Sequence, residues 1–188
     1  MDKQSRYDMA YMKMAKEWSQ LSFANRMKVG AIIVKDQQII SDGFNGMPSG
    51  MDNCCEGDDG QTKKEVLHAE ANAILKCAKH RGGCAGSTLY ITLSPCQDCA
   101  KLIHQAGIKR VVYSDIYRHG NGLEFLNSCG IKTEKINLWK HLLWTFQLVF
   151  IWETKNMVYA NKKIDWKINM ITVGNCDECK RVHPLVSK

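Results

Sequence analysis

The chain has 188 residues, enough for one domain with a well-formed core and an appended segment. Its nine cysteines and polar start argue against a secreted, disulfide-based protein, and favour reduced thiols and metal ligands in the cytoplasm. The formal net charge of +7 favours anionic ligands but does not separate nucleotides from nucleic acids.

Hydrophobic periodicity and turn residues predict alternating helices and strands. In chain order, the expected elements are a helix over 5–22, a hairpin of strands over 29–34 and 38–44 with its turn at 35–37, a long loop over 45–65, a helix over 66–80, a strand over 88–92, a helix over 97–106, a strand over 110–113, a helix over 121–129 and a strand over 131–136. This alternation predicts an α/β protein with helices on the faces of one sheet.

Two short motifs together supply the ligands of a zinc ion. They are His68-Ala69-Glu70 and Pro95-Cys96-Gln97-Asp98-Cys99. One imidazole and two thiolates leave one tetrahedral position for water, as in catalytic zinc sites. The pattern H-x-E followed by P-C-x-x-C is typical of zinc nucleobase deaminases. It predicts one Zn²⁺ ion on His68, Cys96 and Cys99, with Glu70 as the catalytic acid and base.

The predicted reaction is hydrolytic deamination of a cytosine ring. Glu70 would take a proton from zinc-bound water, which attacks C4, and would then protonate N3 and the departing amine. On spacing alone, a lone C-x-x-C fits half of a structural zinc ribbon or a redox pair as well as it fits a catalytic site. The H-x-E motif, the adjoining Pro95 and the helix-compatible context disfavour both of those alternatives. A four-ligand structural site would also need a further Cys or His, and the possible ones, Cys77, Cys84 and His104, are poorly spaced.

The chain from Lys28 to about Thr133 resembles the deoxycytidylate (dCMP) deaminases of phage type, within the cytidine deaminase superfamily. The resemblance is carried by MKVGAIIV (27–34), GFNGMPSG (43–50), NCC (53–55), HAEANAIL (68–75), TLYITLSPCQDCAKLI (88–103) and GIKRVVYSDIY (107–117). It implies a three-layer α-β-α fold with a mixed five-stranded sheet over residues 1–136, and a C-terminal extension over 137–188. It also implies conversion of dCMP to dUMP, the precursor of thymidylate.

The same resemblance implies a set of substrate-binding residues. They are Asn45 for the sugar, the backbone of Ala69 with Leu93 and Ser94 for the base and its amine, Tyr117 for the face of the pyrimidine, and Arg26 and Lys28 for the 5′-phosphate. A solvated basic face is the alternative for the last two.

The resemblance further implies a homo-oligomer, with a hexamer favoured, that dCTP activates and dTTP inhibits. Gly46 and Lys79 are the expected effector contacts, and Mg²⁺ is expected only together with a triphosphate. Lys76 replaces an aromatic residue that discriminates effectors in a phage-type relative, so the effector response is left open. A second, structural zinc at Cys54 and Cys55 is also left open, because residues 56–67 contain no further His.

The apolar stretch Leu142 to Trp152 is too short to cross a bilayer, so no membrane partner is expected. It is expected to bury against the domain or another subunit. Cys176, Cys179 and His183 form a weak metal signal, for which free thiols are favoured.

Two alternatives to a nucleotide deaminase stay open: a polynucleotide deaminase acting on tRNA adenosine or single-stranded DNA cytosine, and a non-catalytic zinc-stabilised binding module. The 45–65 loop is acidic, which favours a closed pocket over a groove for a strand, so no stable nucleic-acid partner is expected. A guanine or pterin deaminase of the same superfamily fits GFNGMPSG poorly. If the chain is phage-encoded, its compartment is the host cytoplasm.

Overall fold

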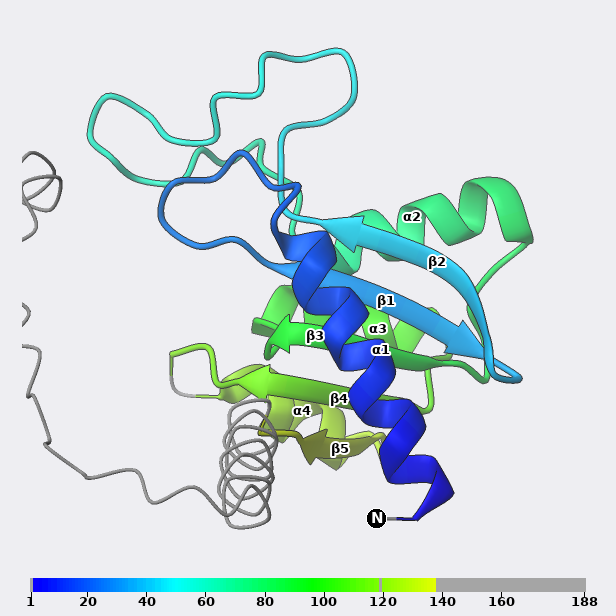
Figure 1. The fold of residues 1–188 in the computed structure, drawn as a ribbon. Coiled ribbons are helices and arrows are strands. Elements are labelled where there is room, and N and C mark those ends of the chain that lie inside the picture. The colour runs from blue at the N-terminus through cyan, green and yellow to red at the C-terminus, as the bar shows by residue number, and fades with distance from the viewer. Residues whose placement is uncertain (1, 119, 138–188) are drawn as a thin grey trace, which may run out of the picture. The chain divides into compact units, whose positions relative to one another are not determined.

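The computed structural model describes residues 2–118 and 120–137 (Figure 1). Their elements are α1 (Lys3–Ser19), β1 (Gly30–Lys35), β2 (Gln38–Phe44), α2 (Ala69–Arg81), β3 (Thr88–Leu93), α3 (Gln97–Gln105), β4 (Arg110–Asp115), α4 (Asn121–Ser128) and β5 (Lys132–Lys135). No helix within these ranges has the length and apolar character needed to cross a membrane. The apolar stretch 142–152 and the group Cys176, Cys179 and His183 lie outside the described residues.

The five strands form one mixed sheet in the order β2-β1-β3-β4-β5. Strand β1 runs antiparallel to β2 and to β3, whereas β3, β4 and β5 are parallel. In Figure 1, α1 crosses one face of the sheet, and α2, α3 and α4 lie behind it. The predicted three-layer α-β-α fold with a mixed five-stranded sheet is confirmed.

Alternation along the strands divides the core into two layers. Ile33 and Leu89 face a cluster that includes residues of α2, α3 and α4. Their neighbours Ile32 and Tyr90 face α1 and pack with Met12 of that helix. Since successive side chains of a strand point to opposite faces, strands buried on both sides must be apolar at consecutive positions, as these are.

Two helix boundaries differ from the prediction. The first helix ends at Ser19, not at residue 22, because residues 20–22 form tighter turns in which each N–H bonds to the carbonyl three residues before it. The second begins at Ala69, not at residue 66, because Leu67 pairs with Gly46 through two backbone hydrogen bonds of 2.9 and 3.1 Å. That pairing fixes the point at which α2 begins.

A partly buried ionic group ties α1 to β4 and β5. The Arg110 guanidinium donates to both carboxylate oxygens of Asp8, at 2.8 and 2.7 Å, and also pairs with Glu134. The Tyr90 hydroxyl donates to Asp8 at 2.6 Å. Burial alone would raise the pKa of Asp8, but the hydrogen bonds from Arg110 and Tyr90 outweigh it and lower that pKa to about 2. The sequence reading did not anticipate this group.

Candidate metal centre and active site

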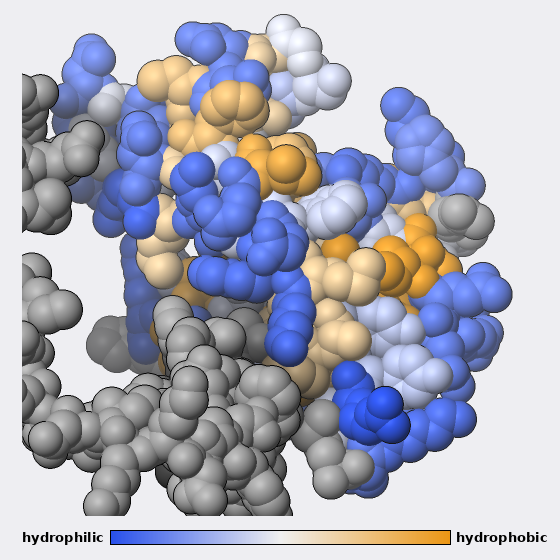
Figure 2. All heavy atoms as spheres, viewed as in Figure 1, coloured by the Kyte–Doolittle hydropathy of each residue, from blue (hydrophilic) through white to orange (hydrophobic). Residues whose placement is uncertain are grey.

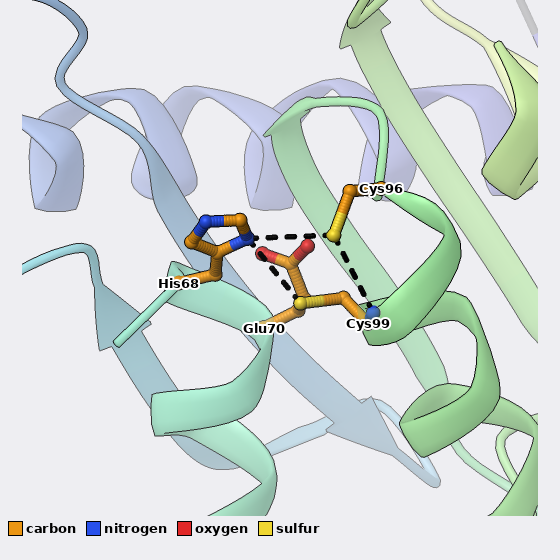
Figure 3. A group of neighbouring side chains, drawn as sticks. All are labelled: His68, Glu70, Cys96 and Cys99. Carbon is orange, nitrogen blue, oxygen red and sulfur yellow. Dashed lines mark hydrogen bonds between the residues drawn. The ribbon is translucent and has the colours of Figure 1, made fainter. Parts of the chain in front are cut away.

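The two halves of the metal motif lie at the starts of two neighbouring helices (Figure 3). His68 is the N-cap residue of α2, and Cys96 is the N-cap residue of α3. Cys99 lies in the first turn of α3, and its N–H donates to the Cys96 sulfur at 3.5 Å. The two sulfur atoms lie close together, as the spacing predicts, because residues i and i+3 at a helix start face the same point.

The distances between these side chains fit a tetrahedral zinc ion. The Nδ1 atom of His68 lies 3.6 Å from the Cys96 sulfur and 3.4 Å from the Cys99 sulfur. Zinc bonds of roughly 2.3 Å to sulfur and 2.0–2.1 Å to nitrogen, at tetrahedral angles, place such atoms about 3.5 Å apart. Candidate ligand atoms of all four residues, Glu70 included, lie within 4.8 Å of one another. The donor set and its spacing therefore match those of a zinc site.

The electrostatics of the sulfurs also favour a cation. Hydrogen bonds with Cys99 and with His68 lower the pKa of Cys96 to about 4. Conversely, the hydrogen bond to Cys96 and burial strongly raise the pKa of Cys99. The pair therefore holds one thiolate and one thiol, because two adjacent thiolates repel each other. A divalent cation removes that repulsion and lets both sulfurs ionise.

Glu70 is the buried carboxyl of the site. It lies in the first turn of α2, is 3% exposed, and borders the same cavity as His68 and Cys96. Burial raises the pKa of Glu70 above its ordinary value. A buried carboxyl group with a raised pKa holds a proton more readily than an exposed one does, which suits acid–base catalysis.

A glycine brings α4 against the zinc-binding turn. A Cβ atom on Gly122 would lie 2.1 Å from the Pro95 carbonyl oxygen and 2.9 Å from that of Cys96. No side chain fits there, so the backbone of α4 packs directly on the segment that carries Cys96. The position of the Cys96 turn is therefore coupled to that of α4.

Three residues of the metal cluster, His68, Glu70 and Cys96, line a cavity of about 460 Å³. Six of the expected substrate-binding residues also line it: Arg26, Asn45, Ala69, Leu93, Ser94 and Tyr117. Lys28 is exposed and is not among the lining residues. The sequence reading missed other lining residues, among them Gln61, Thr62 and Arg118. For Arg118 the available signal was its place directly after Tyr117.

The predicted loop over the mouth supplies part of the cavity wall. Its Glu56 carboxylate accepts the N–H groups of Asn25 and Arg26, at 3.0 and 3.3 Å. The Arg26 side chain donates to Gln61 of the same loop at 2.8 Å. These contacts join segments about thirty residues apart and fix the wall beside Arg26.

The Asn45 side chain holds the segment before β1. Its Oδ1 accepts the Val29 N–H at 2.8 Å, and its Nδ2 donates to the Met27 carbonyl at 2.9 Å. An amide side chain has two donor hydrogens and two acceptor lone pairs, so one of each is left for a ligand. The sugar contact expected for Asn45 stays a prediction that this geometry allows.

The remaining predicted residues are not members of the metal cluster. Gly46 forms the backbone pairing with Leu67, and Lys79 is exposed on α2. Cys54 is exposed, whereas Cys55 is buried beside Ala24 and Val66. Within residues 2–118 and 120–137, the cluster around His68 is the one group of three or more His, Cys, Asp or Glu residues spaced to hold a metal.

Comparisons with known proteins agree with this geometry. Residues 5–115 match the family described as the cytidine and deoxycytidylate deaminase zinc-binding region. The chain is 36% identical over 140 residues to the deoxycytidylate deaminase of Enterobacteria phage T4, which spans 53% of this chain and 72% of the relative. It is 37% identical over 121 residues to that of Mycobacterium phage D29, which spans 57% of this chain and 93% of the relative.

A solved structure is also similar to this chain. The crystal structure of the dCMP deaminase from cyanophage S-TIM5, in complex with dCMP and dUMP, is 48% identical with a TM-score of 0.68. The match covers 72% of this chain and 99% of that chain. The family match covers more than half of the chain and includes all four residues of the metal cluster. The chain therefore belongs to the cytidine and deoxycytidylate deaminase zinc-binding family.

Proposed function

We propose that this chain is a zinc-dependent hydrolase that converts dCMP to dUMP and ammonia. The observation that carries the proposal is the cluster of His68, Cys96 and Cys99 around a buried Glu70, at a cavity of nucleotide size with arginines among its lining. The named activity of the phage relatives and of the S-TIM5 enzyme supports dCMP as the substrate.

His68, Cys96 and Cys99 would hold the zinc ion, and Glu70 would stay free of it. Zinc in such a site supplies Lewis acidity that makes water nucleophilic near neutral pH. Glu70 accepts a proton from the attacking water and donates a proton to N3 of the pyrimidine. It then takes the proton of the new hydroxyl group at C4 and transfers it to the amino group, which leaves as ammonia while C4 becomes a carbonyl. The burial that raises the pKa of Glu70 suits both transfers.

The cavity rim supports a base bound beside Glu70. Tyr117 is positioned by its N–H, which donates to the Ser94 hydroxyl at 2.8 Å, and the Ser94 N–H donates to the Asp115 carbonyl at 2.7 Å. We assign Tyr117 to the face of the pyrimidine, and Ser94 with Leu93 and Ala69 to its edge. Asn45 would contact the sugar through the donor and acceptor that its backbone contacts leave free.

We also propose that the chain forms a cytoplasmic homohexamer that dCTP activates and dTTP inhibits. Gly46 and Lys79 would contact these effectors, and Mg²⁺ would bind together with the effector triphosphate. Exposed apolar side chains such as Phe23, Met27 and Met51 support subunit association, since such groups are commonly buried in oligomers. In Figure 2, apolar surface lies among hydrophilic residues on the face that carries α1. Lys76 is engaged by Asp42 at 2.8 Å, which supports an altered effector response.

The test compares substrates and one variant. Ammonia release is followed with dCMP, dCTP, CMP and deoxycytidine, each with and without added dCTP or dTTP, and with tRNA and single-stranded DNA. We expect turnover of dCMP, and none of the polynucleotides.

The matched variant is Glu70→Gln, which keeps the shape of the side chain but cannot carry the proton. We expect unchanged zinc content and thermal stability, and a rate lower by about 10²–10⁴-fold. Wild-type turnover in Glu70→Gln would contradict the mechanism. Faster turnover of tRNA or single-stranded DNA than of dCMP would show that the chain is a polynucleotide deaminase instead.

A further inference from the structure

We infer that Asn72 is a positioning residue that aligns the metal-binding start of α2 with the nucleotide-binding segment at Asn45. The inference rests on the proposed function and deepens it. Figure 3 shows His68 and Glu70 at the start of α2, beside the two cysteines of α3. Asn72 is half-buried and is not among the residues that line the cavity, so it acts through its neighbours and not on the substrate.

Asn72 contacts both of the parts that it aligns. Its backbone N–H donates to the His68 carbonyl at 2.9 Å, which closes the first turn of α2 on the expected metal ligand. Its side-chain Nδ2 donates to the Phe44 carbonyl at 3.0 Å, and Phe44 directly precedes Asn45. One residue therefore links the turn that carries the metal ligand and the proton-transfer group with the segment expected to bind the sugar.

The metal-binding turn lies between two anchors to the same segment. Before the turn, Leu67 and Gly46 pair through backbone hydrogen bonds of 2.9 and 3.1 Å. After it comes the bond from Asn72 to Phe44. A single anchor would leave the helix start free to rotate about that point, whereas two anchors, one on each side, fix both its position and its direction.

Contacts with β2 determine where α2 begins in space. The N-cap residue His68 makes no side-chain hydrogen bond to the helix, so its imidazole is available to the metal but does not hold the helix start. The backbones of the two elements touch, because a Cβ atom on Gly43 would lie 2.3 Å from the Ala69 carbonyl oxygen and 2.7 Å from the Ala73 nitrogen. The Asn72 amide is the side-chain bond that fixes this contact at the end that borders the cavity.

The segment at Asn45 is also held independently of α2. The Ser22 hydroxyl donates to the Asn45 carbonyl at 2.7 Å, and the Asn45 N–H donates to the Val29 carbonyl at 3.1 Å. Loss of the Asn72 amide therefore leaves the nucleotide segment in place and loosens the helix start alone. Since a displacement of about 1 Å between reacting groups can cost about a hundredfold in rate, the effect belongs in kcat and not in KM.

The test uses the zinc-loaded full chain with Asn72→Ala and Asn72→Asp. Alanine removes the donor and favours a helix, so this variant should fold, whereas aspartate keeps the shape and replaces the donor by an acceptor. The matched control is Ser41→Ala, which removes a bond of 2.7 Å to the Ala73 carbonyl at the same contact of β2 with α2. Ammonia release from dCMP gives kcat and KM, and calorimetry gives the Kd for dUMP.

A second readout does not depend on turnover. Co²⁺ is bound in place of zinc, and its visible absorption spectrum, which depends on the geometry around the ion, is recorded with and without dUMP. We expect dUMP to change this spectrum in the wild type and in Ser41→Ala. In both Asn72 variants the change should be smaller, because the bound nucleotide is no longer aligned with the metal-binding turn.

We expect both Asn72 variants to lower kcat for dCMP by about ten- to a hundredfold, while KM and the Kd for dUMP change by less than about threefold. Ser41→Ala should keep kcat within about twofold of wild type. Zinc content should be full in all three variants, and Asn72→Ala should lose no more thermal stability than Ser41→Ala, because each loses one hydrogen bond of the same kind.

Wild-type kcat in Asn72→Ala would overturn the inference, as would a rise in KM alone or a loss of zinc. A fall in kcat of the same size in Ser41→Ala would also overturn it, because any weakening of the contact between β2 and α2 would then suffice. A wild-type protein that responds to dUMP in the Co²⁺ spectrum but releases no ammonia from dCMP would refute the proposed function alone. The spectral comparison would still decide the role of Asn72.

Discussion

The contact between Gly122 and the zinc-binding turn leads to a sharp prediction for Gly122→Ala. Alanine normally favours a helix over glycine by up to about 1 kcal/mol, so propensity alone predicts a more stable α4. The structure predicts the reverse. The new methyl carbon would lie 2.1 Å from the Pro95 carbonyl oxygen, so α4 and the turn must separate by about 1 Å to restore an ordinary contact.

The size of the effect follows from that displacement. Overpacking of this kind costs about 1–3 kcal/mol, which lowers the melting temperature of a unit of this size by roughly 3–15 °C. A metal site tolerates about 0.2 Å in its bond lengths, so a shift of this size at Cys96 should also weaken zinc binding.

The assay is thermal unfolding together with zinc content after dialysis. The matched control is Asn121→Ala, which adds no bulk at the contact and alters an exposed neighbour on the same helix. We expect the control to stay within about 0.5 kcal/mol of wild type. A Gly122→Ala protein with the wild-type melting temperature and full zinc content would refute the reasoning.

Three further predictions test other parts of the molecule. Zinc binding at pH 7, measured calorimetrically in buffers of different ionisation enthalpy, should release about one proton or more. The strongly raised pKa of Cys99 keeps a proton on that thiol, while Cys96, with its pKa about 4, is already ionised. No proton release would contradict this ligand set. Asp8→Asn should be less stable than wild type at pH 7. Because the folded-state pKa of Asp8 is depressed to about 2, the difference in free energy of unfolding should be full above pH 3.8 and vanish as the pH falls through about 2. Acid titrations of both proteins, followed by circular dichroism, measure this difference, and a difference that persists at lower pH would refute the prediction. Glu56→Ala should raise the KM for dCMP about three- to tenfold with kcat nearly unchanged, because the cavity wall loses the hydrogen bonds from Asn25 and Arg26 to Glu56. Glu56→Gln keeps an acceptor oxygen and should raise the KM less. Steady-state kinetics measure both values, and a fall in kcat alone would argue against a role of Glu56 in binding.

The metal centre was predictable because its geometry is local. Cys96 and Cys99 are three residues apart at a helix start, and His68 precedes another helix, so sequence spacing already fixes which atoms converge. The sheet was predictable for a similar reason, since apolar residues at consecutive positions mark strands that are covered on both faces.

The remaining features depend on contacts between distant segments. Arg110 meets Asp8 across 102 residues, and no local pattern links a helix near the start of the chain with the fourth strand. Glu56 similarly fixes residues about thirty positions before it, so the path of the mouth loop could not be drawn from its composition. The close approach at Gly122 needs the position of α4 relative to the zinc-binding turn, which only the packed structure supplies.

The loop carrying Glu56 and Gln61 closes on itself through a bridge between Glu56 and Thr62, and it donates no atom to the metal cluster. The residues that could hold the metal and the loop that forms part of the cavity wall therefore come from separate segments of the chain. If the pocket binds dCMP as proposed, substitutions in the loop should alter substrate binding while the metal cluster stays intact.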